Sequence, residues 1–518
     1  MERLHGKMLL ILLFVVAAAF AVFPLTDTDI WWHLACAREW VTTWTPVREP
    51  VVNVHYYFQQ VVAFVYGIGG AQALVFFKAI LWGIVFALFM KPFLNREGKV
   101  SFLGACVGIV LLFLFRYQME MRPVVFSLLF LGIYWNILPF IFQTKTALKK
   151  WAACLVLLVI QWFWCKTQGL FVLGPILAAG VFLVEFFKAE DTRRKMLPWG
   201  LFPLAMFCMP FLHREGLSLF LYPFGLLDRL LGLSQSATIF ASEIAENRSP
   251  VTLLQSGENT LVSFGMVFLA VISIGHEILR VLFLRKQVLQ DNSRSMILHI
   301  TLLVAAVLSL MAERNLVLFL PVLLVVLLTT PKVASFANVI PASEPESASR
   351  ILRSAFIILI AFIFGLWIRS LQVYDHTMVS YQRVPVAAAV WMKANPHDGR
   401  LFNDDRAGGY LAFVNPSDST YIDGRFILKT ADFFEQYLGF AENPETFVEY
   451  AVQNQIGRVI LPTRYYARWN KLIADLDSRK QAWNRVYQDE YFVVFDRPFI
   501  HCHRSVPAKK WELKWQNP

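Results

Sequence analysis

Long apolar stretches separated by short polar connections set the pattern of the whole chain. About eleven of them are long and apolar enough to cross a bilayer as a helix, which takes roughly 20 residues. They cover residues 8–25, 71–92, 101–116, 123–142, 151–164, 169–187, 197–212, 261–283, 296–311, 314–330 and 354–371. The pattern therefore predicts a mainly α-helical protein, most of which is a polytopic transmembrane helical bundle.

The positive charges predict the orientation of this bundle. If the N-terminus is cytoplasmic, every loop on the inner side is basic, as with Lys145, Lys149 and Lys150. Basic inner loops are what the positive-inside rule requires. An odd number of spans then places the C-terminal part outside. We expect a bacterial inner-membrane protein with a periplasmic C-terminal domain, although an archaeal membrane would give a similar pattern.

Composition agrees with a membrane protein and weakens one alternative. The chain is 57% hydrophobic and 16% charged, whereas a soluble globular protein carries about 25% charged residues. A net charge of +11 could indicate a nucleic-acid partner. The basic residues lie in short loops between apolar stretches, so orientation in the membrane explains them better. We expect membrane lipids and no nucleic acid as partners, and the scattered cysteines show no metal-ligand spacing.

The hydrophobic pattern changes near Val384. Short β-like runs at 399–403, 420–423, 457–461 and 491–495 alternate with helix-like runs at 385–394, 431–440, 444–455 and 467–476. Such alternation is typical of an α/β domain. We predict a membrane domain over residues 1–372 and a small α/β domain over 373–518. Its most polar clusters, Asp404–Arg406 and Asp423–Arg425, are interpreted as turns.

The first outer loop, residues 26–70, carries the most distinctive polar motif. Asp27 and Asp29 occur where the chain leaves the membrane, and His33 follows four positions after Asp29, on the same face of a helix. Carboxylates at a membrane surface are costly unless they are used. The alternative is that Asp29 only caps a helix running to about Thr43.

Other polar residues fall on the same predicted side of the membrane. They are Arg122, Lys166, Gln168, Glu243, Arg248 and Arg314. A transporter would place such residues near the middle of the bilayer, so the distribution favours a catalyst or receptor at the outer surface. The alternative for Arg122 and Arg314 is a structural ion pair with Glu120 and Glu313, and Arg248 could equally be a solvated loop residue.

This layout resembles the GT-C superfamily of membrane glycosyltransferases. Within it, the chain is most similar to a bacterial, lipid-linked-sugar transferase-like (PMT/ArnT-like) group. The resemblance covers nearly the whole chain and rests on five motifs in order. They are Asp27–Leu34, Arg122–Ser127, Ser242-Glu243, Arg314-Asn315 and Ile422–Arg425.

The resemblance implies transfer of a sugar from a polyprenyl-phosphate-linked donor to a lipid, glycan or protein acceptor on the outer face. Asp29, or else Asp27, would be the general base that takes the acceptor proton. Arg122 and Arg314 would stabilise the phosphate leaving group, whose oxygens match a guanidinium fork. Further substrate contacts are expected from His33, Lys166, Gln168, Glu243 and Arg248.

One motif departs from the group. Relatives often have W-x-N-x-H-G before the sixth span, where this chain has Trp164 to Gly169 with Lys166 and Gln168 at the asparagine and histidine places. Glutamine hydrogen-bonds but cannot titrate, and lysine adds a cation. The departure indicates a different donor or acceptor, or lower activity.

Metal dependence separates the remaining alternatives. We expect no metal, because arginine already carries the phosphate charge; a Mg²⁺ or Mn²⁺ ion would be held by Asp27, Asp29 and Glu243. A metal would favour an oligosaccharide or glycan-chain transferase. A non-catalytic scaffold for envelope glycans would instead use the aspartate pair only as a helix cap.

Overall fold

A computed structural model describes residues 2–41, 43–48, 51–94, 102–189, 193–231, 233–234, 238–258, 260–283, 293–329 and 346–498. Within these residues, seven helices are long and apolar enough to cross a membrane. They are α3 (Tyr56–Leu94), α5 (Val124–Gln143), α6 (Ala147–Cys165), α7 (Leu173–Lys188), α13 (Thr260–Phe283), α15 (Ser293–Met311) and α17 (Glu346–Val373). The chain is therefore an integral membrane protein with the predicted helical bundle; the count of eleven spans stays a prediction.

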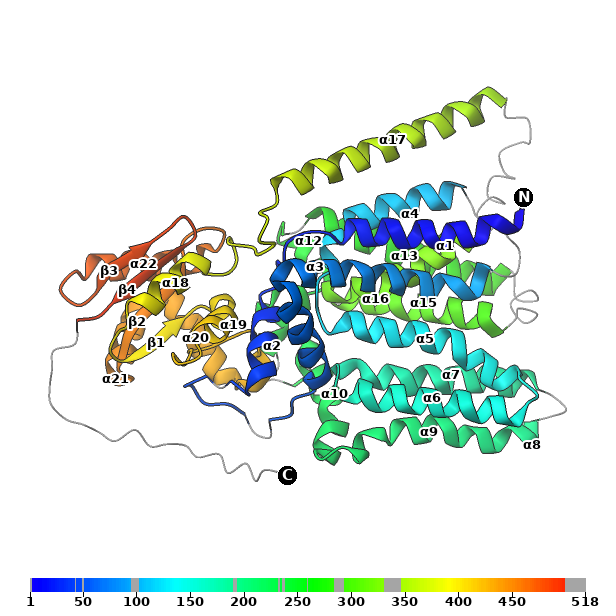
Figure 1. Cartoon of the computed structure of the whole chain (residues 1–518), viewed down its shortest axis with the longest axis horizontal. Coiled ribbons are helices and arrows are strands. Elements are labelled where there is room, and N and C mark those ends of the chain that lie inside the picture. Colours follow the sequence, from blue (N-terminus) through cyan, green and yellow to red (C-terminus); the bar gives the residue numbers. More distant parts are fainter. Residues whose placement is uncertain are drawn as a thin grey trace.

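Shorter apolar helices complete the bundle (Figure 1). These are α1 (Glu2–Phe20), α4 (Phe102–Leu114), α10 (Gly216–Leu231) and α16 (Leu316–Thr329). Helix α1 packs closely on α3, because a side chain at Gly83 would overlap Phe14. Large aromatic residues such as Trp82, Tyr134 and Trp164 fill the interior. Many apolar side chains on the outside of the bundle are exposed, as expected for a surface that faces lipid.

The predicted outer loop 26–70 is partly helical. It contains α2 (Asp29–Arg38) and the first part of α3, which bends at Gly69 and Gly70. Gly70 has a φ of 63°, in the left-handed region that favours glycine. The apolar run before the bend is too short to cross a bilayer, so span length did not reveal it as a helix.

The predicted span 197–212 is a chain of short pieces. Helices η3 (Leu197–Gly200), α9 (Leu201–Phe207) and η4 (Met209–Leu212) follow α8 (Arg193–Met196). Prolines at 198, 203 and 210 interrupt the backbone ladder, because proline has no amide hydrogen to donate. Helices α11 (Thr238–Glu243) and α12 (Pro250–Gln255) lie in the following outer segment.

The C-terminal part contains the predicted α/β structure. Four strands, β1 (Arg400–Asn403), β2 (Ile456–Pro462), β3 (Asn484–Gln488) and β4 (Phe492–Asp496), form one sheet in the order β1-β2-β4-β3. The β1–β2 pair is parallel and the other two pairs are antiparallel. The helices are α18 (Val386–Ala394), α19 (Asp405–Val414), α20 (Ala431–Glu442), α21 (Pro444–Gln453) and α22 (Asn470–Ser478). The boundary at residue 372 stays a prediction, next to the end of α17.

Three elements of this part differ from the sequence prediction. Residues 420–423 are not a strand: the Asn403 side chain receives the Tyr421 amide at 2.7 Å and donates to the Ile422 carbonyl at 2.7 Å. A side chain thus satisfies backbone groups that a strand ladder would otherwise satisfy. Strand β3 and helix α19 were not predicted, the helix because its two glycines at 408 and 409 lower helix propensity.

Close packing joins the C-terminal part to the first outer loop. A side chain at Gly409 of α19 would come within 3.1 Å of the Trp32 amide nitrogen of α2. The Trp44 amide donates to the Thr420 carbonyl at 3.0 Å, and the Arg48 amide donates to the Leu428 carbonyl at 2.7 Å. Helix α2 consequently lies between the sheet-containing part and the bundle (Figure 1).

We expect Gly409→Val to loosen this contact. A branched side chain there meets the backbone of α2, and overpacking of this kind costs about 1–3 kcal/mol. Thermal unfolding in detergent should show a lower midpoint, with faster proteolysis near residues 373–384. Gly439→Val in α20 is the matched control, since nothing lies within 4 Å of a side chain added there. Equal effects of the two variants would contradict the packing argument.

Candidate active site

Two connected cavities lie where the bundle meets the C-terminal part. The polar arm, of about 290 Å³, is lined by the bundle and by C-terminal residues that include Arg383, Arg406 and Tyr466. The membrane arm, of about 180 Å³, runs between apolar side chains that include Leu170 and Leu318. Both arms share the residues Asp27, Asp29, Trp32, His55, Arg122, Tyr222, Leu226 and Arg314. The predicted aspartates and arginines are therefore at the junction.

A chain of ion pairs crosses this junction. Arg122, just before α5, binds the Asp27 carboxylate at 3.0 Å and the Glu246 carboxylate at 2.5 Å. Arg314 lies 3.6 Å from the other Glu246 oxygen and donates to Asn247 at 2.8 Å. Burial alone would raise the pKa of Glu246, but Arg122 and Arg314 outweigh it and lower the pKa to about 2. Glu246 is therefore a fixed negative charge that holds both arginines.

Asp29 lies beside this chain without joining it. It is the first residue of α2 and forms no ion pair among the described residues. Burial, followed by the charge of Asp27, raises the pKa of Asp29 well above its ordinary value, and Arg122 only partly opposes the shift. A side chain at Gly424 would overlap the Asp29 carboxylate, so the backbone of residues 423–425 covers it. The carboxylate is enclosed and faces a cavity, a combination typical of functional groups.

The helix-cap alternative has a different geometry from the one found. Thr28 is the N-cap of α2, its side chain makes no capping bond, and the helix ends at Arg38 and not near Thr43. The Asp29 amide is 3.4 Å from the Asp27 carboxylate. Both carboxylates line the cavity. The hypothesis of a non-catalytic scaffold required the aspartate pair to serve only as a helix cap, and the structure shows Thr28 at that position instead.

Two histidines form one wall of the membrane arm. His33 is buried, its ring lies against Trp32, and its centroid is 5.1 Å from that of His55. Burial lowers the pKa of His33 well below its usual range and that of His55 to about 4. Both imidazoles are therefore neutral at pH 7. His55 was not among the predicted site residues.

Of the other predicted site residues, one lines a cavity and three do not. Gln168 lines the membrane arm and accepts a hydrogen bond from Ser127 at 3.1 Å. Lys166 forms an ion pair with Glu215 and lines neither arm. Glu243 pairs with Arg468, and Arg248 with Glu258, and neither lines the cavities.

The ion-pair partners of the two arginines in the structure differ from Glu120 and Glu313, the partners that the structural alternative predicted from the sequence. Arg122 pairs with Asp27 and Glu246 in place of Glu120, whose carboxylate instead accepts the Thr26 hydroxyl. Arg314 forms its ion pair with Glu246 and not with Glu313.

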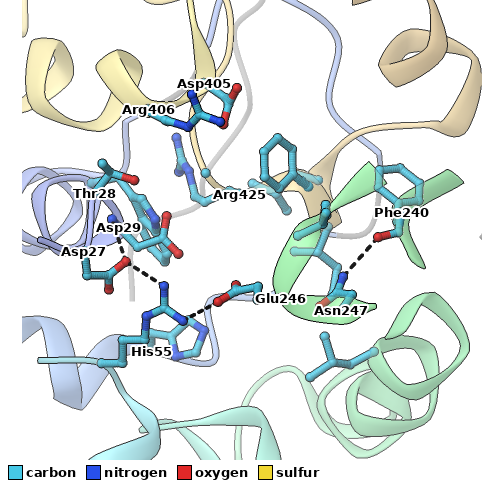
Figure 2. Close-up of a pocket in the computed structure, with 18 of the residues that line it drawn as sticks. Asp27, Thr28, Asp29, His55, Phe240, Glu246, Asn247, Asp405, Arg406 and Arg425 are labelled. Atoms are coloured by element: carbon cyan, nitrogen blue, oxygen red, sulfur yellow. Dashed lines mark hydrogen bonds and ion pairs between the residues drawn. The ribbon is translucent and has the colours of Figure 1, made fainter. Parts of the chain in front are cut away.

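The C-terminal part supplies site residues that sequence reasoning interpreted as turns. Figure 2 shows Asp405 and Arg406 on the opposite side of the cavity from Asp27 and Glu246. The Arg406 guanidinium lies over the Tyr466 ring. Arg425 binds Asp423 through two nitrogens, at 2.5 and 3.0 Å. In the sequence, the polar clusters Asp404–Arg406 and Asp423–Arg425 stood out, but nothing indicated that they lie next to the first outer loop.

Lys78 was also absent from the predicted site residues. The sequence did carry a signal for it, since it is a lone cation inside the apolar stretch 71–92. Its amine is fully buried in α3, donates to the Phe23 carbonyl at 3.0 Å and lies 3.3 Å from the Phe23 ring centroid. Glu120, next to it, holds Thr26 through its carboxylate and Trp82 through its carbonyl. These contacts fix the backbone that leads into Asp27.

The carboxylates at this junction are those of Asp27, Asp29 and Glu246, and Arg122 pairs with the first and the last of them. The Oδ2 atom of Asp27 is buried and accepts no hydrogen bond among the described residues. Glu243, the third ligand predicted for a metal, faces Arg468. The described part of the chain assembles a three-ligand cluster of His, Cys, Asp or Glu elsewhere, but not here. At the junction, the described residues thus do not bring three such ligand atoms within 4.8 Å of one another.

Comparison with solved structures identifies the fold. The archaeal oligosaccharyltransferase AglB from Archaeoglobus fulgidus, in complex with an inhibitory peptide and a dolichol-phosphate, matches with a TM-score of 0.52 and 13% identity, over 92% of this chain and 73% of that one. The same organism's oligosaccharyltransferase in complex with Zn and sulfate matches with a TM-score of 0.53 and 14% identity, over 92% of this chain and 71% of that one. The structure of this enzyme tethered to an acceptor peptide with the NVT sequon matches with a TM-score of 0.52 and 13% identity, over 95% of this chain and 74% of that one.

Sequence comparison adds nothing to this result: no family model and no curated protein matches the chain. At this identity the structural likeness establishes the fold alone. The chain has the GT-C fold, as its motifs predicted.

We expect Lys78→Met to destabilise the protein. The change removes the donor to the Phe23 carbonyl and the cation beside Glu120, and an unsatisfied buried group costs about 1–3 kcal/mol. Thermal unfolding should show a lower midpoint than for Lys91→Met, an exposed lysine on the same helix. If both variants unfold with the wild-type midpoint, Lys78 does not support the backbone before Asp27.

Proposed function

We propose that this protein is a membrane glycosyltransferase that moves a sugar from a polyprenyl-phosphate-linked donor to an acceptor on the periplasmic face of a bacterial inner membrane. The observation that supports this most is the junction itself. An apolar arm and a polar arm meet beside two arginines at Asp29, a carboxylate that forms no ion pair with the residues the structure describes. This arrangement places a base between a lipid-like path and a water-accessible one.

The membrane arm suits the donor. Leu170, Leu226, Val317 and Leu318 provide an apolar wall for a lipid chain, and Arg314 stands where that wall ends. The Arg314 side chain is 36% exposed and its ion pair is long, at 3.6 Å, so it has donors left for a phosphate. Cations fixed in place stabilise the charge that grows on a leaving phosphate. A dolichol-phosphate is bound in one structure of the same fold.

The two aspartates then have different roles. Asp27 is held by Arg122, whereas Asp29 has no ion pair and a raised pKa, which is closer to the value that suits a base near neutral pH. Asp29 takes the proton of the acceptor group as that group attacks the anomeric carbon. The bond from this carbon to the phosphate oxygen breaks, with inversion, and its electron pair leaves with the phosphate, whose negative charge Arg314 and Arg122 stabilise.

The polar arm suits a hydrophilic acceptor. Trp40, Phe426 and Tyr466 offer aromatic faces, and Arg406 offers a cation without an ion pair among the described residues. Aromatic faces bind the apolar faces of sugars and leave polar groups to orient them. The acceptor would therefore approach Asp29 from the side of the C-terminal part.

An oligosaccharide transferase is the second candidate. It is favoured by the fold of the similar structures, which are oligosaccharyltransferases, one of them with Zn. Asp27 and Asp29 would be its metal ligands. Glu246, the third carboxylate near the junction, is held by Arg122 and Arg314, and Glu243 faces Arg468; both observations favour the metal-independent route, in which the arginines alone hold the phosphate.

Asp29→Asn should lower transfer by about 10²–10⁴-fold, the usual contribution of a general base. The assay follows release of polyprenyl phosphate from a panel of synthetic polyprenyl-phosphate monosaccharides in proteoliposomes. Donor binding should persist, since the arginines are intact. Asp375→Asn, an exposed aspartate, is the control. Full activity of Asp29→Asn would remove Asp29 as the base.

The pH profile tests the same assignment independently. A base acts when deprotonated, so kcat/KM should fall as the pH drops through the raised pKa of Asp29, well above the ordinary aspartate value. Asp27→Asn removes a negative charge that contributes to the shift, so the acidic limb should move to lower pH. An acidic limb that Asp27→Asn leaves in place would contradict this electrostatic coupling.

Chelation separates the two candidates. Treatment with EDTA should leave the transfer rate unchanged, because the base and the phosphate cations are side chains. A rate that is lost in EDTA and restored by Mn²⁺ would instead favour the metal-dependent oligosaccharide transferase.

A further inference from the structure

A second cluster of ligating side chains lies in the bundle, away from the cavity. His276 and Glu277 belong to α13, and His299 belongs to α15. The Glu277 Oε1 atom is 3.0 Å from the His276 Nδ1 atom and 2.7 Å from the His299 Nδ1 atom. One donor atom from each residue lies within 4.8 Å of the other two. Glu277 lies near the C-terminal end of α13.

A carboxylate at this place needs an explanation. Glu277 is only 5% exposed in an otherwise apolar span, and an ionisable group in a membrane span is costly unless it is paired or used. Arg280, one turn further on, binds the second oxygen, Oε2, at 3.3 Å. It offsets part of the charge, fixes the carboxylate plane, and leaves Oε1 to the two imidazoles.

We propose that His276, Glu277 and His299 form a divalent-cation site, with Zn²⁺ as its occupant, that fastens α13 to α15. Two imidazoles and one carboxylate are a ligand set that zinc favours, at bonds of about 2.0–2.2 Å. Three protein ligands leave a fourth position for water. Ligand atoms of one tetrahedral zinc ion are about 3.3 Å apart, so the present separations of 2.7 and 3.0 Å would have to open by about 0.6 and 0.3 Å.

Arg280 takes the part of an outer group in such a site. Ligating carboxylates are usually held by a further hydrogen bond, which orients them and tunes the metal. The planes of the two histidine rings differ by 24°, and their centroids are 6.0 Å apart. His276 contacts Glu277 from the same helix, α13, whereas His299 contacts it from α15. Binding would release any proton carried on the two Nδ1 atoms and would cross-link neighbouring spans.

The consequence is structural and separate from the proposed transfer reaction. The cluster shares no residue with either arm of the cavity. Loss of the ion should therefore lower the thermal midpoint before it affects the chemistry at Asp29.

Metal content of the purified protein tests the site. The full chain is prepared without a polyhistidine tag, and Zn is measured by mass spectrometry. We expect one Zn per chain in the wild type, and tetrahedral cobalt absorption after exchange with Co²⁺. His299→Ala should lose both signals, His299→Cys should keep them because thiolate also binds zinc, and His376→Ala, an exposed histidine, should not change them.

His276→Ala repeats the test if His299→Ala fails to fold, because the His276 ring is more exposed, at 37% against 12%. Zn²⁺ should raise the thermal midpoint of the wild type, of His376→Ala and of His299→Cys, and should leave that of both alanine variants of the cluster unchanged. Equal metal content in the wild type and in both alanine variants would overturn the proposal. The cluster would then be a hydrogen-bonded clasp without a metal.

Discussion

The guanidinium of Arg122 is the interaction on which the site depends. It joins Asp27 of the first outer loop to Glu246 of a loop more than a hundred residues away, through bonds of 3.0 and 2.5 Å. Arg122 takes Asp27 into an ion pair, whereas the neighbouring Asp29 forms none with any residue in the described part of the chain. The Asp27 charge then acts on Asp29 and raises its pKa together with burial. One arginine thus divides two aspartates that the sequence presents as nearly equivalent.

Glycines determine how closely the C-terminal part approaches this pair. At Gly409 and Gly424 a side chain would meet α2 or the Asp29 carboxylate itself. The absence of a Cβ at both places allows backbone to cover the junction from outside. Enclosure by backbone has an electrostatic effect as well as a steric one, since it removes water from a group whose ionisation depends on hydration. The C-terminal part is in this sense one wall of the site.

Hydropathy and short motifs predicted the membrane helices, the GT-C fold and the aspartate and arginine residues of the junction. They could not predict which side chains of the C-terminal part reach it, because Gly424 and Asp29 are far apart in sequence and meet only through tertiary packing. Loop chemistry was also ambiguous. Glu243 and Glu246 are three residues apart, yet only Glu246 faces the arginines. The strand expected at 420–423 failed for a local reason, since the Asn403 side chain replaces the ladder.

The departure at Gln168 acquires a physical meaning in this geometry. Gln168 lines the membrane arm, whereas Lys166 is paired with Glu215 outside it, so the substitution adds no cation to the arm. His33 and His55, on the same wall, are neutral at pH 7 because burial lowers their pKa values. Positive charge for a phosphate must then come from the arginines, which stay charged at every physiological pH. Asp29 is the carboxylate at the junction whose pKa burial and the charge of Asp27 raise.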